Sequence, residues 1–242
     1  MEKKDSLRTV QRALDILDCF SMQKQELTLT EISKMIDLAK STTTRMLSTL
    51  EANGLIVKNE STMKYKLGHK LYYMGSVAAK SFDIKEVAKP VMSKLREETS
   101  ETVNLYTIVN DKRICIEQFE GLRPLRHLVS LGQPLPLFAG AGGKVLLAHQ
   151  SESFQARIFK QMNDPDRIPG LRADLAQIKE QGYAVTHEER EQGLSAISAP
   201  IFNQAGEVHY CISISGLSQR FTDENVTKYL SSLKELVDQL LS

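Results

Sequence analysis

The sequence predicts an α+β protein with two domains, and three observations lead to this fold class. The chain has 242 residues, more than one ordinary domain needs, and its 41% hydrophobic content is enough to form a buried core. The composition changes near residue 75, because all seven prolines and most of the glycines lie beyond it. Apolar residues recur at helical spacing before this boundary, whereas expected strands and helices alternate irregularly after it.

The composition also limits the classes of protein to which the chain can belong. Its 31 Lys and Arg nearly balance 30 Asp and Glu, so the net charge points to neither a nucleic-acid nor a membrane partner. Residues 1–75, however, hold 12 basic and 9 acidic side chains, against 19 and 21 in the remainder. The absence of an apolar run of about 18 residues and the polar N-terminus predict no membrane span and no signal peptide. The three cysteines are far apart, which excludes a disulfide framework or CxxC metal site and favours the cytoplasm.

Three helices and a β-hairpin are expected in the first part. Apolar residues at helical spacing predict a helix that ends near Phe20. Thr28 and Glu31 have capping-box spacing, which predicts the start of a second helix. Ser41 is expected to cap a third helix, and Gly54 to end it. The expected elements are helices at about 6–20, 28–36 and 41–53, and strands at 55–58 and 64–67 around a polar turn.

The second part is expected to form a mixed sheet domain. A helix over 69–79 joins the two parts, and Pro90 is expected to open a helix that ends near Thr99. Further strands are predicted at 103–109, 113–119, 182–186, 196–202 and 208–215, and further helices at 139–149, 151–160, 172–181 and 222–241. This irregular alternation favours an α+β sheet domain over a bundle or a sandwich.

Two short helices, a tight turn and a hairpin are typical of a winged helix-turn-helix. The third helix would then enter the major groove of DNA, with its N-terminal residues at the base edges. Leu47 and Leu50 must face the core, so the opposite face is predicted to contact DNA, together with Lys64 on the wing. The candidate DNA-binding residues are Lys40, Ser41, Thr42, Thr44, Arg45, Thr49 and Lys64.

An alternative interpretation of this segment is a helical protein–protein module with a solvated, threonine-rich face. The lysine and arginine side chains can neutralise phosphates, and the threonines can donate to phosphates or contact a thymine methyl group. A run of hydroxyl side chains is a poor helix former, which favours selection of this face for contacts.

Segments of both parts follow the pattern of one known family. In the first part they are Ala13–Leu17, Leu29–Ile32, Lys40–Thr42, Arg45–Leu47, Gly54–Leu55 and Tyr65–Gly68. In the second part they are Gly132–Ala139 with Gly143–Ala148, Gly182–Val185 with Glu188–Glu189, and Ala199–Ile201 with Ser213–Gly216. In these segments the chain resembles the IclR-type family of bacterial transcriptional regulators. The resemblance implies a winged helix-turn-helix domain at 1–68, a linker helix at 69–82 and a GAF-like effector-binding and oligomerisation domain at 83–242. It also implies a homodimer or homotetramer that binds a palindromic operator in double-stranded DNA.

The resemblance implies effector contacts at three places in the second part. These candidate residues are Gly140, Ala141, Gly142, Thr186, Ala196, Ser213 and Ser215. A helix start without bulky side chains offers free N–H groups to an anion, and serines two apart on a strand point to one face. This pattern fits a small carboxylate with hydroxyl or keto oxygens, although close helix packing and ordinary strand serines would explain the same residues.

Two of these positions depart from relatives that bind very small oxo-acids. Thr186 and Ala196 stand where such relatives have an aspartate and a cysteine, which disfavours a glyoxylate-like ligand. Sugar acids, hydroxy acids and aromatic acids remain as candidate effectors.

The remaining motifs are weaker indications of function. The Gly140–Lys144 segment lacks the first glycine and the Ser/Thr of a Walker A loop, and the His187–Glu191 segment is expected to be a solvated loop between strands. No nucleophile–base pair is recognisable, so we expect no catalytic residue, cofactor or metal. The favoured function is a ligand-responsive regulator, and more specifically a repressor of a catabolic operon. The alternative is a small-molecule-binding module or enzyme whose N-terminal helices serve assembly.

Overall fold

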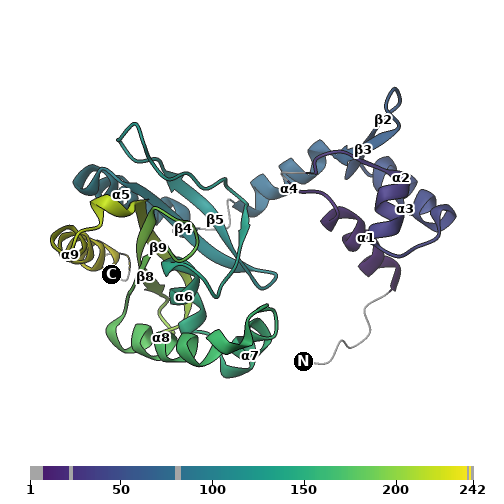
Figure 1. Cartoon of the computed structure of the whole chain (residues 1–242). Coiled ribbons are helices and arrows are strands. Elements are labelled where there is room, and N and C mark those ends of the chain that lie inside the picture. Colours follow the sequence, from purple (N-terminus) through teal and green to yellow (C-terminus); the bar gives the residue numbers. More distant parts are fainter. Residues whose placement is uncertain (1–7, 22–23, 80–82, 239, 241–242) are drawn as a thin grey trace. The chain divides into compact units, whose positions relative to one another are not determined.

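The computed structural model describes residues 8–21, 24–79, 83–238 and 240, and divides into two compact units, residues 1–82 and 83–242 (Figure 1). Unit 1 contains the helices α1 (Arg8–Asp18), α2 (Leu29–Met35), α3 (Lys40–Ala52) and α4 (His69–Ala79). Its antiparallel sheet has the order β1-β3-β2, formed by β1 (Leu27–Thr28), β2 (Ile56–Asn59) and β3 (Lys64–Leu67). Ile16, Ile32, Leu47 and Ile56 are fully buried at its centre. The predicted winged helix-turn-helix is therefore confirmed.

Local signals in the sequence explain most of the helix ends in unit 1. The capping box is present, because the Glu31 N–H donates to Thr28 Oγ1 (3.3 Å) and the Thr28 N–H donates to Glu31 (2.8 Å). Gly54 follows the last turn of α3 with φ +71°, a conformation that glycine adopts without strain. The prediction that Ser41 caps α3 is wrong, because the helix begins at Lys40 with Ala39 as N-cap. Thr43 bonds Ala39 O through both its N–H and its hydroxyl, so the first turn closes one position earlier than expected.

Gly68 joins the wing to α4 at a point of very close backbone approach. Its N–H donates to Leu55 O (2.8 Å), and a Cβ at this position would lie 2.2 Å from the carbonyl oxygen of Gly54. Only glycine fits there. Gly68, the residue before α4, is therefore packed directly on Gly54 and Leu55, which lie just after the end of α3.

Unit 2 is built on one antiparallel sheet with the order β6-β5-β4-β9-β8-β7. Its strands are β4 (Thr102–Val109), β5 (Lys112–Phe119), β6 (Pro134–Leu135), β7 (Ala184–His187), β8 (Leu194–Phe202) and β9 (Val208–Leu217). Its α-helices are α5 (Asp83–Thr99), α6 (Ala141–Ala148), α7 (Glu152–Phe159), α8 (Ile168–Gln181) and α9 (Asp223–Asp238), with short 3₁₀ helices at Pro165–Arg167 and Ser218–Arg220. None of the described helices is both long and apolar enough to cross a lipid bilayer. The expected mixed α/β domain is confirmed.

The two faces of this sheet bury different sets of helices. Helices α5 and α9 cover one face, and α6, α7 and α8 cover the other (Figure 1). Side chains alternate between these faces along β9, so Ile212 and Ile214 pack under α5 and α9 while Cys211 packs under α6. Ser213 and Ser215 thus belong to the face covered by α6.

The expectation that Pro90 opens a helix is wrong, because Pro90 lies inside α5. Proline removes one helical hydrogen bond, but Pro90 is on the exposed side, where water can bind the freed carbonyl. The opposite side of α5 buries Ala88, Val91, Met92 and Leu95 on the sheet, and this burial offsets the lost bond.

Candidate functional site

Helix α3 carries the first candidate site on the face that points away from the core. Leu47 and Leu50 are buried, as expected. Lys40, Ser41, Thr44, Arg45 and Thr49 are exposed and Thr42 is half-buried. Lys64 is half-buried on the wing strand β3. The structure thus gathers the candidate α3 residues on one helix and places the candidate lysine on the neighbouring hairpin.

Thr44 and Thr49, two exposed threonines of α3, do not present free hydroxyl donors. Thr44 Oγ1 donates to Lys40 O (2.8 Å) and Thr49 Oγ1 donates to Arg45 O (3.0 Å). In this conformation these two threonines present their methyl groups and the remaining lone pairs of their oxygens to a binding partner. A thymine methyl group is therefore a better match for them than a phosphate oxygen.

A groove between α1 and α3 adds an arginine that the sequence reasoning missed. It is lined by Thr9, Arg12, Ala13, Thr42, Arg45, Met46, Thr49 and Leu50. No carboxylate of the described residues pairs with Arg12 or Arg45. Two unpaired guanidinium groups beside hydroxyl side chains favour contact with a polyanion.

The second candidate site is a small cavity of about 40 Å³ in unit 2, between the sheet and the start of α6. Six of the seven candidate effector residues line it, namely Gly140, Ala141, Thr186, Ala196, Ser213 and Ser215. Gly142 does not line the cavity, because it packs behind it, where a Cβ would come within 2.9 Å of Arg113 Nη1. Residues from five strands and from two loops therefore meet at one helix start.

The first amide of α6 is not free, contrary to expectation. The Ala141 N–H donates to the hydroxyl oxygen of Thr186 (3.1 Å). Because Thr186 Oγ1 accepts this bond, its own O–H remains available to a ligand. The Thr186 O–H thus replaces the Ala141 N–H as the hydrogen-bond donor that faces the cavity.

Arg113 is the feature of the cavity that the sequence reasoning missed. Its side chain is 4% exposed, yet no described carboxylate lies within ion-pair distance, and its buried Nε has no hydrogen-bond partner. The guanidinium stacks on the Tyr106 ring at 4.5 Å. Burial lowers the pKa of Arg113, but a guanidinium remains charged at neutral pH. Buried charges are normally paired, so this unpaired cation is suited to an anionic ligand.

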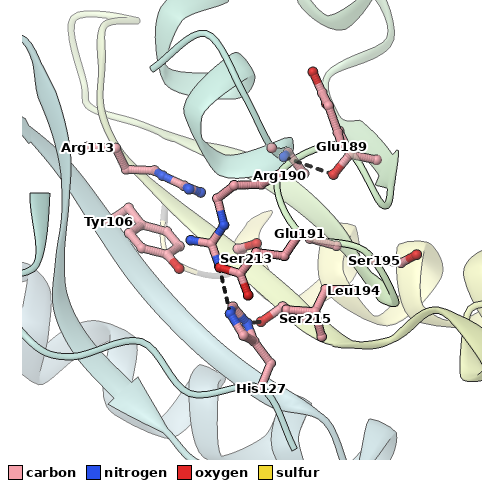
Figure 2. Close-up of a pocket in the computed structure, with 14 residues that line it drawn as sticks. Tyr106, Arg113, His127, Glu189, Arg190, Glu191, Leu194, Ser195, Ser213 and Ser215 are labelled. Atoms are coloured by element: carbon pink, nitrogen blue, oxygen red, sulfur yellow. Dashed lines mark hydrogen bonds and ion pairs between the residues drawn. The ribbon is translucent and has the colours of Figure 1, made fainter. Parts of the chain in front are cut away.

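A chain of hydrogen bonds lines the other end of the cavity (Figure 2). Arg190 Nη2 donates to His127 Nε2 (2.8 Å), and His127 Nδ1 lies 2.9 Å from Ser215 Oγ. Burial and the neighbouring Arg190 charge lower the pKa of His127 to about 4, so the ring is neutral. Because arginine only donates, Nε2 accepts and Nδ1 carries the proton that His127 donates to Ser215.

Ser215 also accepts a bond from Asn104 Nδ2 (3.2 Å). A serine oxygen that accepts twice has only its own O–H left to offer. Ser215 is therefore a donor toward the cavity. Neither His127 nor Asn104 could be found from the sequence, because one lies in a loop and the other reads as an ordinary strand residue.

The loop over 188–193 was expected to be solvated, but several of its side chains form ion pairs and line the cavity. Glu189 forms an ion pair with Lys144 (2.8 Å), whose Nζ also bonds Asp174 (2.7 Å). Arg190 pairs with Glu191 (2.7 Å), and all three loop residues line the cavity. Lys144 is therefore occupied by carboxylates, unlike the lysine of a phosphate-binding loop.

The cysteines and the acidic residues supply no further reactive site. Burial raises the pKa of Cys115 to about 12 and that of Cys211 to about 11, which keeps both as thiols. No group of three His, Cys, Asp or Glu side chains that could hold a metal occurs within the described ranges.

Comparisons with known proteins cover both units. Residues 9–60 match the model of the IclR helix-turn-helix domain, and residues 76–241 match that of the bacterial transcriptional regulator IclR C-terminal domain. The HTH-type transcriptional regulator XynR of Escherichia coli is 35% identical, over 95% of this chain and 94% of its own. The transcriptional repressor IclR of the same organism is 28% identical, over 92% and 85%. A crystal structure of an IclR homolog from Microbacterium hydrocarbonoxydans, complexed with 4-hydroxybenzoate, shares the fold with a TM-score of 0.78, 20% identity and coverage of 96% and 97%.

Proposed function

Because this chain belongs to the IclR family of bacterial transcriptional regulators, we propose that it is a repressor of a catabolic operon that a small organic acid releases from DNA. As a member of this family it is a DNA-binding regulator and not an enzyme. We place it in the cytoplasm, as a homodimer or homotetramer on a palindromic operator. The acid would be a sugar acid, a hydroxy acid or an aromatic acid.

The observation that carries this proposal is Arg113. A guanidinium that is buried without a carboxylate destabilises the folded protein, unless a ligand supplies the missing anion. The cavity beside it also offers the O–H groups of Thr186 and Ser215. A carboxylate at Arg113 with further oxygens toward these hydroxyls would satisfy both.

The DNA contacts are proposed on α3 and the wing. Arg45 and Lys40 would face the major groove or its phosphates, Thr42, Thr44 and Thr49 would contact base edges, and Lys64 would contact the backbone. The operator would be read by two copies, since helix-turn-helix dimers match the two-fold symmetry of palindromes.

The effector changes DNA affinity only if it binds the DNA-competent and incompetent states unequally, typically with a coupling of about 1–3 kcal/mol. Helix α4 connects the wing to the second unit in the sequence, and we propose that it is the element that changes between these states. The acid would favour the state with the wrong spacing between paired α3 helices.

The test begins with a thermal-shift screen of small carboxylates, followed by DNA titrations with a site selected from a random-sequence library. Arg113→Gln removes the charge and should abolish the response to any acid while operator binding is retained. Ala141→Asp places a negative charge in the cavity and should do the same. Arg172→Gln is the matched control, because Arg172 also stacks on an aromatic ring, Phe159 at 4.7 Å, but is exposed and outside the cavity. If Arg113→Gln responds to the acid as the wild type does, the effector binds elsewhere.

A further inference from the structure

We propose that the effector is a polyhydroxylated aliphatic monocarboxylic acid, and that Ser213 and Ser215 select its hydroxyl groups over keto oxygens, methylene groups and aromatic rings. This inference rests on the proposed function, since it assigns the chemical class of the acid that binds at Arg113. It rests on three observations: the composition of the cavity wall, the direction of each hydrogen bond in it, and the carboxylates at its rim.

The cavity wall offers little apolar surface to an aromatic ring or to an unsubstituted aliphatic chain. Its apolar side chains are Ala141, Leu194, Ala196 and Tyr106, and the other lining residues apart from Gly140 are polar or charged. The lining includes two aromatic rings, of which His127 is held by hydrogen bonds to Arg190 and Ser215, and Arg113 stacks on that of Tyr106 at 4.5 Å. An aromatic acid would leave polar groups of the wall without partners, which costs binding free energy.

The two serines of β9 have opposite hydrogen-bonding roles toward a ligand. Ser213 Oγ donates to Ile197 O (3.2 Å), so it offers the cavity only acceptor lone pairs. Ser215 Oγ accepts from His127 and Asn104, so it offers only its O–H. The side chains are two residues apart on one strand and face the same side.

A hydroxyl group is the ligand group that satisfies both serines. A keto oxygen can accept from Ser215 but cannot donate to Ser213, and a methylene group does neither. Thr186 supplies a second donor nearby, because its oxygen already accepts from Ala141. A chain that carries several hydroxyls can therefore meet donors and acceptors along this wall, with its carboxylate at Arg113.

The acidic rim favours a single carboxylate in the ligand. Glu189 and Glu191 line the cavity, and their charges are held by Lys144 and Arg190. They would repel a second ligand carboxylate, whereas their oxygens can accept hydrogen bonds from ligand hydroxyls. Dicarboxylic acids are thus disfavoured.

His127 acts as a positioning residue for this selection. Arg190 holds its Nε2 as an acceptor, which fixes the proton on Nδ1 and makes Ser215 accept. His127→Leu should lower affinity for hydroxy acids more than it lowers affinity for unsubstituted acids. His127→Gln, whose amide has both an acceptor and a donor, should restore most of the hydroxy-acid affinity.

Calorimetric titration of the full chain with matched acids tests the proposal. The probes are threonate, arabinonate, gluconate and galactonate; the unsubstituted butanoate, pentanoate and hexanoate; the keto acid 2-oxopentanoate; the dicarboxylate glutarate; and benzoate and 4-hydroxybenzoate. We expect at least one of the polyhydroxylated acids to bind about tenfold or more tightly than every other probe, the difference that one to two hydrogen bonds produce. An unsubstituted, keto, dicarboxylic or aromatic acid that binds as tightly overturns the inference.

Serine variants then show whether the selection arises where it is proposed. Ser213→Ala and Ser215→Ala should each reduce the preference for the hydroxy acid over the unsubstituted acid of the same length. Ser198→Ala is the matched control, because Ser198 pairs with Ser213 across the sheet and also donates to a backbone carbonyl, Ile212 O at 2.8 Å, but does not line the cavity. An unchanged preference in both cavity variants overturns the assignment of the serines.

The failure of this inference differs from the failure of the proposed function. If acids bind and Arg113→Gln abolishes their binding, but hydroxyl groups bring no gain, only the inference is wrong. If no probe binds to the wild type, or if binding persists in Arg113→Gln, the carboxylate site itself is wrong and both are overturned.

Discussion

Arg113 occupies an inward position on β5, where an apolar side chain would pack against the ring of Tyr106 and the backbone of Gly142. Gly142 is needed for this arrangement, since a side chain there would meet the guanidinium. The stacking on Tyr106 compensates for part of the lost hydration, because a desolvated cation–π contact is worth about 2 kcal/mol or more, against several kcal/mol for burying an ion. Packing contacts alone therefore do not explain why a charged side chain is buried at this position.

His127 predicts a specific dependence of stability on pH. Its pKa is about 4 in the folded protein and near 6.5 in the unfolded chain, because burial and Arg190 oppose its charge while Glu191 favours it only weakly. The unfolded chain therefore takes up a proton first as the pH falls. The contribution of neutral His127 to the free energy of unfolding is fully present above pH 6.5. It is lost between pH 6.5 and 4, on the order of 3 kcal/mol in total.

Urea unfolding of the wild type and of His127→Gln, followed by circular dichroism between pH 4.5 and 7.5, measures this difference. Burial also lowers the pKa of His149, so the wild type alone does not isolate His127. The variant should lose less stability than the wild type as the solution is acidified. Parallel curves for the two proteins would show that folding does not lower the pKa of His127.

Single residues also show where prediction from sequence stops. Arg113 could have been found, because a charge in an expected strand, two positions before a buried cysteine, must share its inward face. The loop that carries His127 has no periodicity, so its approach to Ser215, 88 positions away, could not be foreseen. Ser213 and Ser215 were nominated through family resemblance and strand spacing, but their opposite hydrogen-bonding roles depend on Ile197, His127 and Asn104.

At the scale of the secondary-structure elements, helix α3 is predicted to bind the operator in the major groove of DNA. Arg45 is exposed on the face opposite Leu47, so Arg45→Ala should leave the fold intact and cost about 1–3 kcal/mol of operator binding. Lys64→Ala on the wing should weaken binding to all sequences more evenly and reduce the salt dependence of binding. Fluorescence-anisotropy titrations over a range of salt concentrations distinguish the two effects. Operator affinity equal to that of the wild type in Arg45→Ala would remove α3 from the major groove.

The elements themselves were predicted well where a local rule determines them. The capping box located the start of α2, and the alternation of apolar residues located β4, β5 and β9. The rules failed where tertiary contacts decide the outcome. The two-residue strands β1 and β6 exist only through pairing with β3 and β5, and α5 extends through Pro90 because its other face is buried.

At the scale of the whole molecule, the exposed apolar residues of α4 predict self-association. Tyr72 and Tyr73 are 80% and 68% exposed, and Met74 and Val77 are each about half exposed in the single chain. Tyr73, Met74 and Val77 fall on one side of the helix, and exposed apolar residues gathered in this way mark an interaction surface, which fits the dimer or tetramer proposed above. Light scattering should give at least twice the 27.2 kDa of one chain, and Tyr73→Glu should shift the population toward the monomer. A monomer at micromolar concentration, both with and without DNA, would contradict this.

The glycine at position 68 determines how a rotation is transmitted inside unit 1. Nothing larger than a hydrogen atom fits between this residue and the Gly54 carbonyl. The start of α4 therefore cannot rotate against the end of α3 without a steric clash. If α3 lies in the major groove as proposed, we expect a rotation of α4 to move α3 with it as one body. In a dimer, such a rotation would change the distance between the two α3 helices relative to the roughly 34 Å repeat of DNA.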